Sequence, residues 1–176
     1  MKIKQLIFVV EANESNKRDS IYIKTFIDYY YKIEKNIVIN YVYMNGKNNY
    51  NKTKIIDKIN QFVKRNNNGE NIVFYCIDTD NINSDRQHFD SFLNISNFCK
   101  ANKYQLIWFC YDIENVFLKR KVEKCDKKKM AVWFIKNIHS LRALKDIELS
   151  KDKVGSNCTS NIVNVLNNYL YKKSKN

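Results

Sequence analysis

Short apolar runs alternate along this chain with stretches in which apolar residues return at helical spacing. Residues 3–11 (IKQLIFVVE) form an apolar, β-branched run that closes on an acid, which is typical of a buried strand. In residues 20–33 (SIYIKTFIDYYYKI) the apolar positions follow a helical period, and Ser20 stands where an N-cap belongs. The beginning of the chain is therefore predicted to be a strand followed by a helix.

The same alternation recurs three more times. We predict strands at residues 36–44, 72–77 and 104–112, and helices at 52–65, at 84–103 with Ser84 as N-cap, and from 113 onward. This order predicts an α/β fold with a mainly parallel, Rossmann-like sheet of about four strands and helices on both faces. We expect one domain over residues 1–176, in which residues 119–176 form a helical C-terminal part.

Acidic residues gather where the predicted strands end. Glu11 closes the first strand, Asp78 and Asp80 follow the third, and Asp112 and Glu114 follow the fourth. In open α/β sheets, ligands bind beyond the carboxyl ends of the strands. We therefore expect these acids to lie along one rim of the sheet, although Asp112 is also typical of a solvated turn.

Several carboxylates on one rim repel each other unless they are protonated or bridged by a cation. Hard oxygen ligands select Mg²⁺ or Mn²⁺, and such an ion keeps positions open for water and phosphate oxygens. The site hypothesis consists of Glu11, Asp78, Asp80 and Glu114. In it, Glu11 orients or activates the attacking water, and the other three acids bind one or two magnesium ions.

The chain is strongly basic. Lys and Arg total 31 against 18 Asp and Glu, a formal net charge of +13, which favours a polyanionic partner such as nucleic acid. A genome biased toward Lys and Asn codons would give the same composition. In the basic run at residues 119–129 (KRKVEKCDKKK), Lys119 and Arg120 are the expected phosphate ligands because they lie nearest the acids, and a solvated helix and loop is the alternative.

Cysteine usage and hydropathy bear on the compartment. The five cysteines form no CxxC pair, and no apolar span reaches the length of a membrane helix. We expect a reduced, cytoplasmic protein with no membrane partner. The chain has no Walker-type glycine loop, so any ATPase would be a separate partner chain.

A Glu that closes the first strand and an Asp-x-Asp that closes a later one resemble the pattern of Toprim domains. Within that group the chain resembles the RloB-like proteins of bacterial defence loci, which are relatives of the OLD-family nucleases. The segments that carry the resemblance are EANESNKRDSIYIKTF, DTDN and CYDIENVFL, and the tail SNCTSNIVNVLNNYL suits the closing helix of such proteins. The resemblance aligns Glu114 with the glutamate of the family's third motif. It implies a Toprim-like fold and a Mg²⁺-dependent endonuclease that acts in antiviral defence.

Two departures from that pattern bear on catalysis. Ala12 stands where Toprim proteins usually have glycine, and the segment that follows is longer than the family's usual turn. Either difference is able to move Glu11 away from the metal.

Other interpretations remain open. An acid at a strand end also serves as an N-cap or turn former, and Asp80 before NINS suits that role. A PIN-like nuclease also collects carboxylates on a parallel sheet, although the Asp78–Asp80 doublet fits it less well. A catalytically silent module that binds nucleic acid or a partner is a further alternative. A receiver-like signalling domain fits poorly, since it expects its acidic pair after the first strand.

Overall fold

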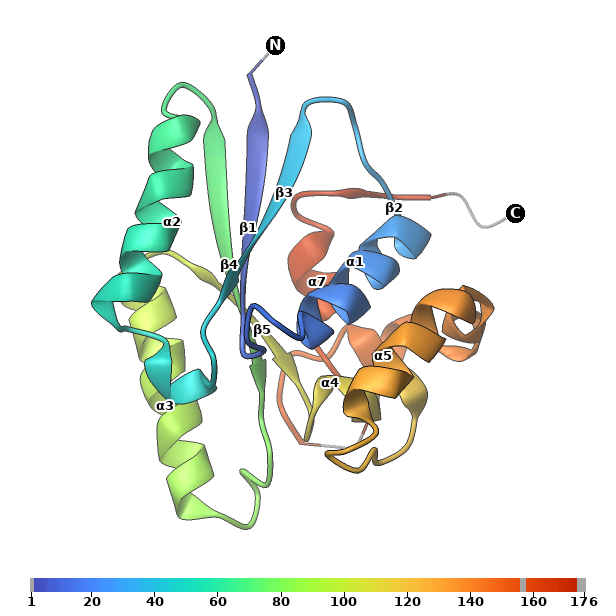
Figure 1. Cartoon of the computed structure of the whole chain (residues 1–176). Coiled ribbons are helices and arrows are strands. Elements are labelled where there is room, and N and C mark those ends of the chain that lie inside the picture. The colour runs from blue at the N-terminus through green and yellow to red at the C-terminus, as the bar shows by residue number, and fades with distance from the viewer. Residues whose placement is uncertain (1, 156–157, 174–176) are drawn as a thin grey trace.

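The computed structural model describes residues 2–155 and 158–173. Its centre is a parallel four-stranded sheet (Figure 1) with the order β3-β1-β4-β5. The strands are β1 (Lys4–Val10), β3 (Ile37–Tyr43), β4 (Glu70–Asp78) and β5 (Gln105–Phe109). The predicted α/β fold with a parallel sheet of four strands is confirmed.

Helices cover both faces of this sheet. Figure 1 shows α2 (Thr53–Arg65) and α3 (Arg86–Ala101) on one side, and α1 (Arg18–Tyr30), α4 (Ile113–Leu118) and α5 (Lys127–Lys136) on the other. The remaining elements are short: β2 (Tyr31–Lys32), η1 (Lys47–Asn49), η2 (Ile138–Ala143), α6 (Asp146–Leu149), α7 (Ile162–Leu166) and β6 (Tyr171–Lys172).

Strand β1 shows why its sequence is apolar throughout. Leu6, Phe8 and Val10 pack into the core beneath α1, whereas Ile7 and Val9 pack into the core beneath α2 and α3. A parallel strand buried on both faces has no polar side, so its sequence reads as a continuous apolar run rather than an alternation.

The chain crosses between the two faces at the centre of the sheet. From β1 the chain runs through α1 to β3, whereas from β4 it runs through α3, on the opposite face, to β5. Since β1 and β4 are neighbours, the segments that follow them diverge to opposite faces, and the carboxyl ends of these strands form the switch point at which α/β sheets bind ligands. The acids of interest follow these two strands.

Two predicted helix caps are wrong. Ser20 lies inside the first turn of α1, where its hydroxyl donates to the carbonyl of Lys17 (2.7 Å), because the helix already begins at Arg18. Asp85 rather than Ser84 caps α3, since its carboxylate accepts hydrogen bonds from the N–H groups of the first turn. A carboxylate at that position also favours the positive end of the helix dipole.

The last strand of the sheet ends earlier than predicted. β5 stops at Phe109, and Tyr111 has a φ of 61°, a left-handed conformation that a continuing strand does not allow. The free edge of β5 is covered by a later segment: Asn161 accepts a hydrogen bond from the N–H of Trp108 (2.9 Å), and Phe109 forms an isolated bridge with Ser160.

The C-terminal part packs on the same core as α1. Leu141, Leu149 and Leu166 are fully buried there. This part contains α5, α6 and α7, and it also contributes β6, which pairs with β2 and had no signal in the sequence pattern. Its residues 156–157 and 174–176 lie outside the described residues. Among the helices that the structure describes, none combines the length and the apolar character needed to cross a membrane.

Candidate carboxylate site at the strand ends

Glu11 and Asp78 meet at the carboxyl ends of the neighbouring strands β1 and β4. Val10, the last residue of β1, is in register with Cys76, so Glu11 follows directly beside the end of β4. Oε1 of Glu11 accepts a hydrogen bond from the backbone N–H of Asp78 (2.8 Å), and Oδ1 of Asp78 accepts one from the N–H of Ile113 (3.0 Å). The two acids are therefore fixed by backbone groups of β4 and α4.

The environment of these acids disfavours their charged forms. Burial raises the pKa of Glu11 to about 8, although the hydrogen bond from Asp78 and the charge of Lys47 act in the opposite direction. Burial also raises the pKa of Asp78 well above its usual range, and the neighbouring charges of Glu11 and Asp19 add to this shift. Crowded and desolvated carboxyl groups need a proton or a cation to stabilise them. Such groups are typical of functional sites.

Lys47 supplies a cation at this rim. Its ammonium group forms an ion pair with Asp80 and donates to the backbone carbonyl of Asp78 (3.4 Å). The loop that carries it is fixed to the end of β1, since the N–H of Gly46 donates to the carbonyl of Glu11 (2.8 Å). Sequence reasoning missed Lys47, because nothing near it in the chain distinguishes it from the many other lysines.

Glu114 belongs to a second, more deeply buried cluster. Its side chain is fully buried, with Oε1 3.3 Å from Nε of Arg18 and Oε2 3.0 Å from Nζ of Lys127. Burial raises the pKa of Glu114 even though Lys127 and Arg18 lower it. Asp112 caps α4 through the N–H of Asn115 and also binds Lys127 (2.8 Å). Glu114 is thus part of a buried ion-pair network, and its charge also raises the pKa of Asp78.

Asp19 lies between the two clusters and was not predicted from the sequence. It is in the first turn of α1, with a side chain that is 8% exposed, and its Oδ2 accepts a hydrogen bond from the N–H of Ala12 (2.7 Å). Its charge raises the pKa of both Glu11 and Asp78. The only signal in the sequence is an acid in the first turn of the helix that follows Glu11, which is also an ordinary helix-dipole position.

Ala12, which stands where Toprim proteins usually have glycine, has a backbone conformation that alanine adopts readily. Within the described residues, the non-glycine positions with positive φ do not include Ala12. Alanine is therefore accommodated there without left-handed strain, and Glu11 remains at the strand end beside Asp78.

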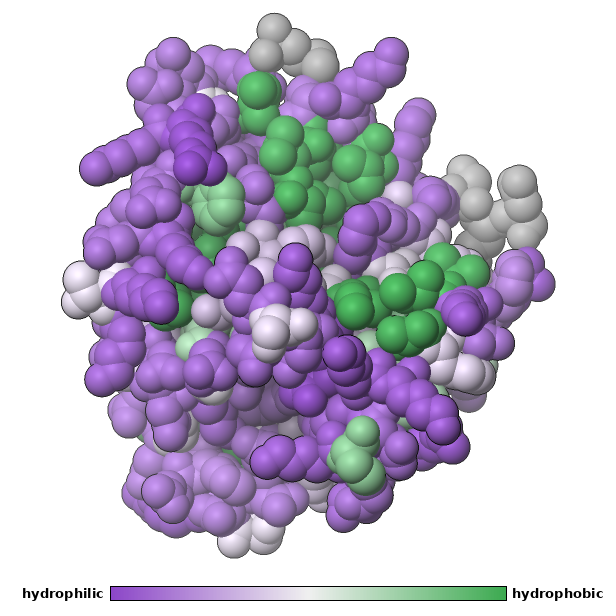
Figure 2. Space-filling model, viewed as in Figure 1, coloured by the Kyte–Doolittle hydropathy of each residue, from purple (hydrophilic) through white to green (hydrophobic). Residues whose placement is uncertain are grey.

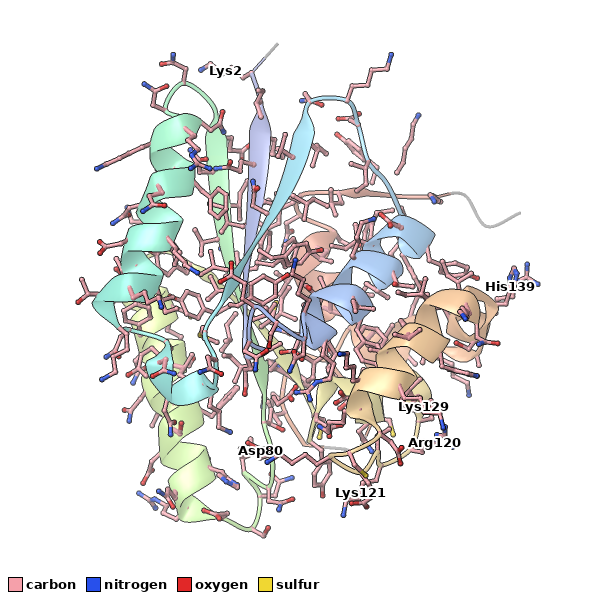
Figure 3. The ribbon with its side chains drawn as sticks, viewed as in Figure 1. Lys2, Asp80, Arg120, Lys121, Lys129 and His139 are labelled. Carbon is pink, nitrogen blue, oxygen red and sulfur yellow. The ribbon has the colours of Figure 1, made fainter. Side chains whose placement is uncertain are left out.

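The two expected phosphate ligands have different surroundings. Nζ of Lys119 binds the carboxylate of Glu148 (2.7 Å) and the carbonyl of Cys158 (3.0 Å). Arg120 is exposed, and its guanidinium donates to the sulfur of Met130 (3.5 Å). Figure 3 shows Arg120, Lys121 and Lys129 near one another, on the side of the molecule to which Asp80 also belongs. Arg120 is the more available of the two for a phosphate.

The expected magnesium site depends on which oxygen donors lie close together. In residues 2–155 and 158–173, no three His, Cys, Asp or Glu side chains are arranged to hold a metal ion. The carboxylates of Asp78 and Asp80 are nevertheless the hard donors that Mg²⁺ prefers. The carboxylate of Asp80 already pairs with the ammonium of Lys47, which contacts Asp78 at its backbone carbonyl. The donors are of the kind that a hard cation binds, and at Asp80 Mg²⁺ would compete with Lys47.

Comparison with known proteins adds no family assignment. A scan against protein-family models and a search of curated proteins each found no match. The Toprim and RloB-like resemblance therefore rests on the three sequence segments alone.

Proposed function

We propose that this protein is a metal-dependent nuclease that hydrolyses phosphodiester bonds of nucleic acid. One observation carries the proposal: Glu11 and Asp78, from neighbouring parallel strands, meet at the carboxyl ends of these strands, where α/β sheets bind ligands, and both have raised pKa values. The resemblance to RloB-like proteins supports an antiviral role, and the net charge of +13 supports a nucleic-acid substrate. A cytoplasmic location and a separate ATPase partner remain predictions from the sequence.

The acids take distinct roles in this proposal. Asp78 and Asp80 are the residues that would hold Mg²⁺ or Mn²⁺, which supplies charge stabilisation to the reacting phosphate when bound. Glu11, whose pKa is raised to about 8, accepts a proton from the attacking water in its ionised form, which a cation bound at the neighbouring acids would favour by lowering that pKa. Glu114 acts from the second cluster by holding Arg18 and Lys127, so the proposal assigns it a supporting role instead of direct metal binding.

A specific observation favours one alternative. Cationic side chains already pair with Asp80 and Glu114, namely Lys47, Arg18 and Lys127. Acids that are neutralised within the protein need no metal. This pairing supports a catalytically silent module that binds nucleic acid or a partner.

A cleavage assay separates the two functions. Labelled RNA and DNA are incubated with wild type, Asp80→Asn and the matched control Asp57→Asn, with Mg²⁺, with Mn²⁺ or with EDTA; Asp57 lies exposed on α2, away from the strand ends. The nuclease proposal expects metal-dependent cleavage by wild type and the control, and its loss in Asp80→Asn. Binding without cleavage under every condition would establish the silent module. Cleavage by Asp80→Asn at the wild-type rate would show that Asp80 is not part of the active site.

A further inference from the structure

A hollow lies directly beside Asp80. Its lining residues come from the loop after β4, the start of α3, the segment after β5, α4 and the loop that follows α4: Asp80, Asn81, His88, Tyr111, Asp112, Asn115 and Lys121. Figure 2 shows that the surface at this end of the molecule is hydrophilic, and Figure 3 places Asp80 and Lys121 at the same end. The hollow therefore continues the candidate site outward to solvent.

The backbone around this hollow is strained at two facing residues. Asp80 has a φ of 52° and Tyr111 a φ of 61°, and the two form an isolated bridge in which the N–H of Asp80 donates to the carbonyl of Tyr111 (2.8 Å). The N–H of Tyr111 is bound in turn by the hydroxyl of Thr79 (3.0 Å). Left-handed residues other than glycine cost free energy and cluster at binding and catalytic sites. The hydrogen bond between these two strained residues keeps Tyr111 and Asp80 together in the lining of the hollow.

The charges of the hollow are suited to a phosphate group. Its two acids are already paired, Asp80 with Lys47 and Asp112 with Lys127. The side chain of Lys121 is 84% exposed, and its ion pair with the exposed Glu123 is long (3.7 Å). Lys121 also lines a second hollow, in which Arg120 and Lys129 stand beside Glu123 and Asp126, so basic side chains outnumber acidic ones along the surface that leads away from Asp80. This gives a phosphate backbone a path that leads to the carboxylates.

We propose that this hollow binds one unpaired nucleotide of the substrate strand, with its base stacked on Tyr111 and its phosphate at Lys121. This assignment rests on the proposed nuclease function and specifies its substrate as single-stranded nucleic acid. Only an unpaired base presents a free face to an aromatic ring, because bases within a duplex stack on each other. The side-chain amides of Asn81 and Asn115 offer donors and acceptors for the edge of that base.

Binding without cleavage tests the subsite. Fluorescence anisotropy in EDTA measures the affinity of a short labelled single strand, and of its duplex, for four proteins: wild type, Tyr111→Leu, Tyr111→Phe and the control Tyr171→Leu. Tyr171 is 71% exposed on β6 and does not line the hollow. We expect wild type to prefer the single strand and Tyr111→Leu to bind it about 5- to 150-fold more weakly, with Tyr111→Phe and the control unchanged.

Equal single-strand affinity of Tyr111→Leu and wild type would overturn the subsite, as would equal affinity for the duplex. Cross-linking of a strand that carries 5-iodouracil to wild type covers the case in which Tyr111→Leu fails to fold: adduct formation at Tyr111 supports stacking, and adducts only elsewhere contradict it. Because these measurements need no cleavage, loss of the subsite and loss of the nuclease function give different results.

Discussion

The carboxylate of Glu11 accepts a hydrogen bond from the backbone N–H of Asp78, and the 2.8 Å contact joins the ends of the two central strands. It holds an acid with a raised pKa against the last residue of β4. The stability of the protein should therefore depend on the protonation of Glu11 and Asp78. Lys47, which pairs with the nearby Asp80, should compete with metal ions for this site.

The first prediction concerns Glu11 and pH. In the unfolded chain Glu11 releases its proton near pH 4.5, whereas in the folded protein it keeps the proton up to about pH 8. Between these values the folded state binds more protons, so wild type loses stability as the pH rises. Glu11→Gln cannot ionise, so in EDTA it should become more stable than wild type by at most about 1.4 kcal/mol per pH unit across this window.

Urea unfolding at several pH values measures this difference. Glu14→Gln is the matched control, since Glu14 has a side chain that is 71% exposed and forms an ion pair with Lys58. Stability curves of Glu11→Gln and wild type that run parallel from acid to alkaline pH would show that Glu11 ionises normally.

The second prediction concerns Lys47. Its ammonium group pairs with the carboxylate of Asp80, which Mg²⁺ would bind, so its removal should strengthen metal binding, roughly tenfold. Thermal unfolding of Lys47→Met against increasing Mg²⁺ or Mn²⁺ should show stabilisation at lower metal concentration than in wild type. Lys52→Met, an exposed lysine that precedes α2, is the control. Weaker stabilisation of Lys47→Met by metal would mean that Lys47 assists the cation instead of replacing it.

The third prediction concerns the buried cluster. Glu114→Ala removes the carboxylate that links Arg18 and Lys127 and leaves them with Asp19 and Asp112 as partners, in a place where incompletely compensated charge is costly to bury. We expect a loss of about 3 kcal/mol in the free energy of unfolding, measured with denaturant. Glu123→Ala removes an acid that is 72% exposed and should change stability by less than about 0.5 kcal/mol. A similar small effect of Glu114→Ala would show that the network contributes little to the fold.

The fourth prediction separates the two basic residues. Arg120→Ala should weaken nucleic-acid binding and reduce the slope of log affinity against log salt by about 1, since one phosphate contact is lost. Lys119→Ala should leave that slope almost unchanged, because Lys119 is bound to Glu148 and to the carbonyl of Cys158. Anisotropy titrations at several salt concentrations give both slopes, and an equal reduction in the two variants would contradict the assignment.

The order of strands and helices followed from the sequence because each signal is local. The apolar run through Leu6 and Val10 is set by burial on both faces of a parallel strand, and any such strand requires it. The positions of Glu11 and Asp78 at strand ends followed from the same reasoning. Local signals were less decisive at element ends, where Asp85 and Ser84 are equally good cap residues and only the course of the backbone selects one.

The composition of the carboxylate site was decided by tertiary structure. Glu114 was expected on one rim with Glu11, Asp78 and Asp80, and the packing of α1 and α5 against α4 also brings Arg18 and Lys127 to it and encloses it in ion pairs. Lys47 reaches Asp80 because the loop after β3 is hydrogen-bonded to the end of β1. Which charges meet depends on strand register and helix packing, which join residues far apart in the chain, whereas sequence periodicity reports only on near neighbours.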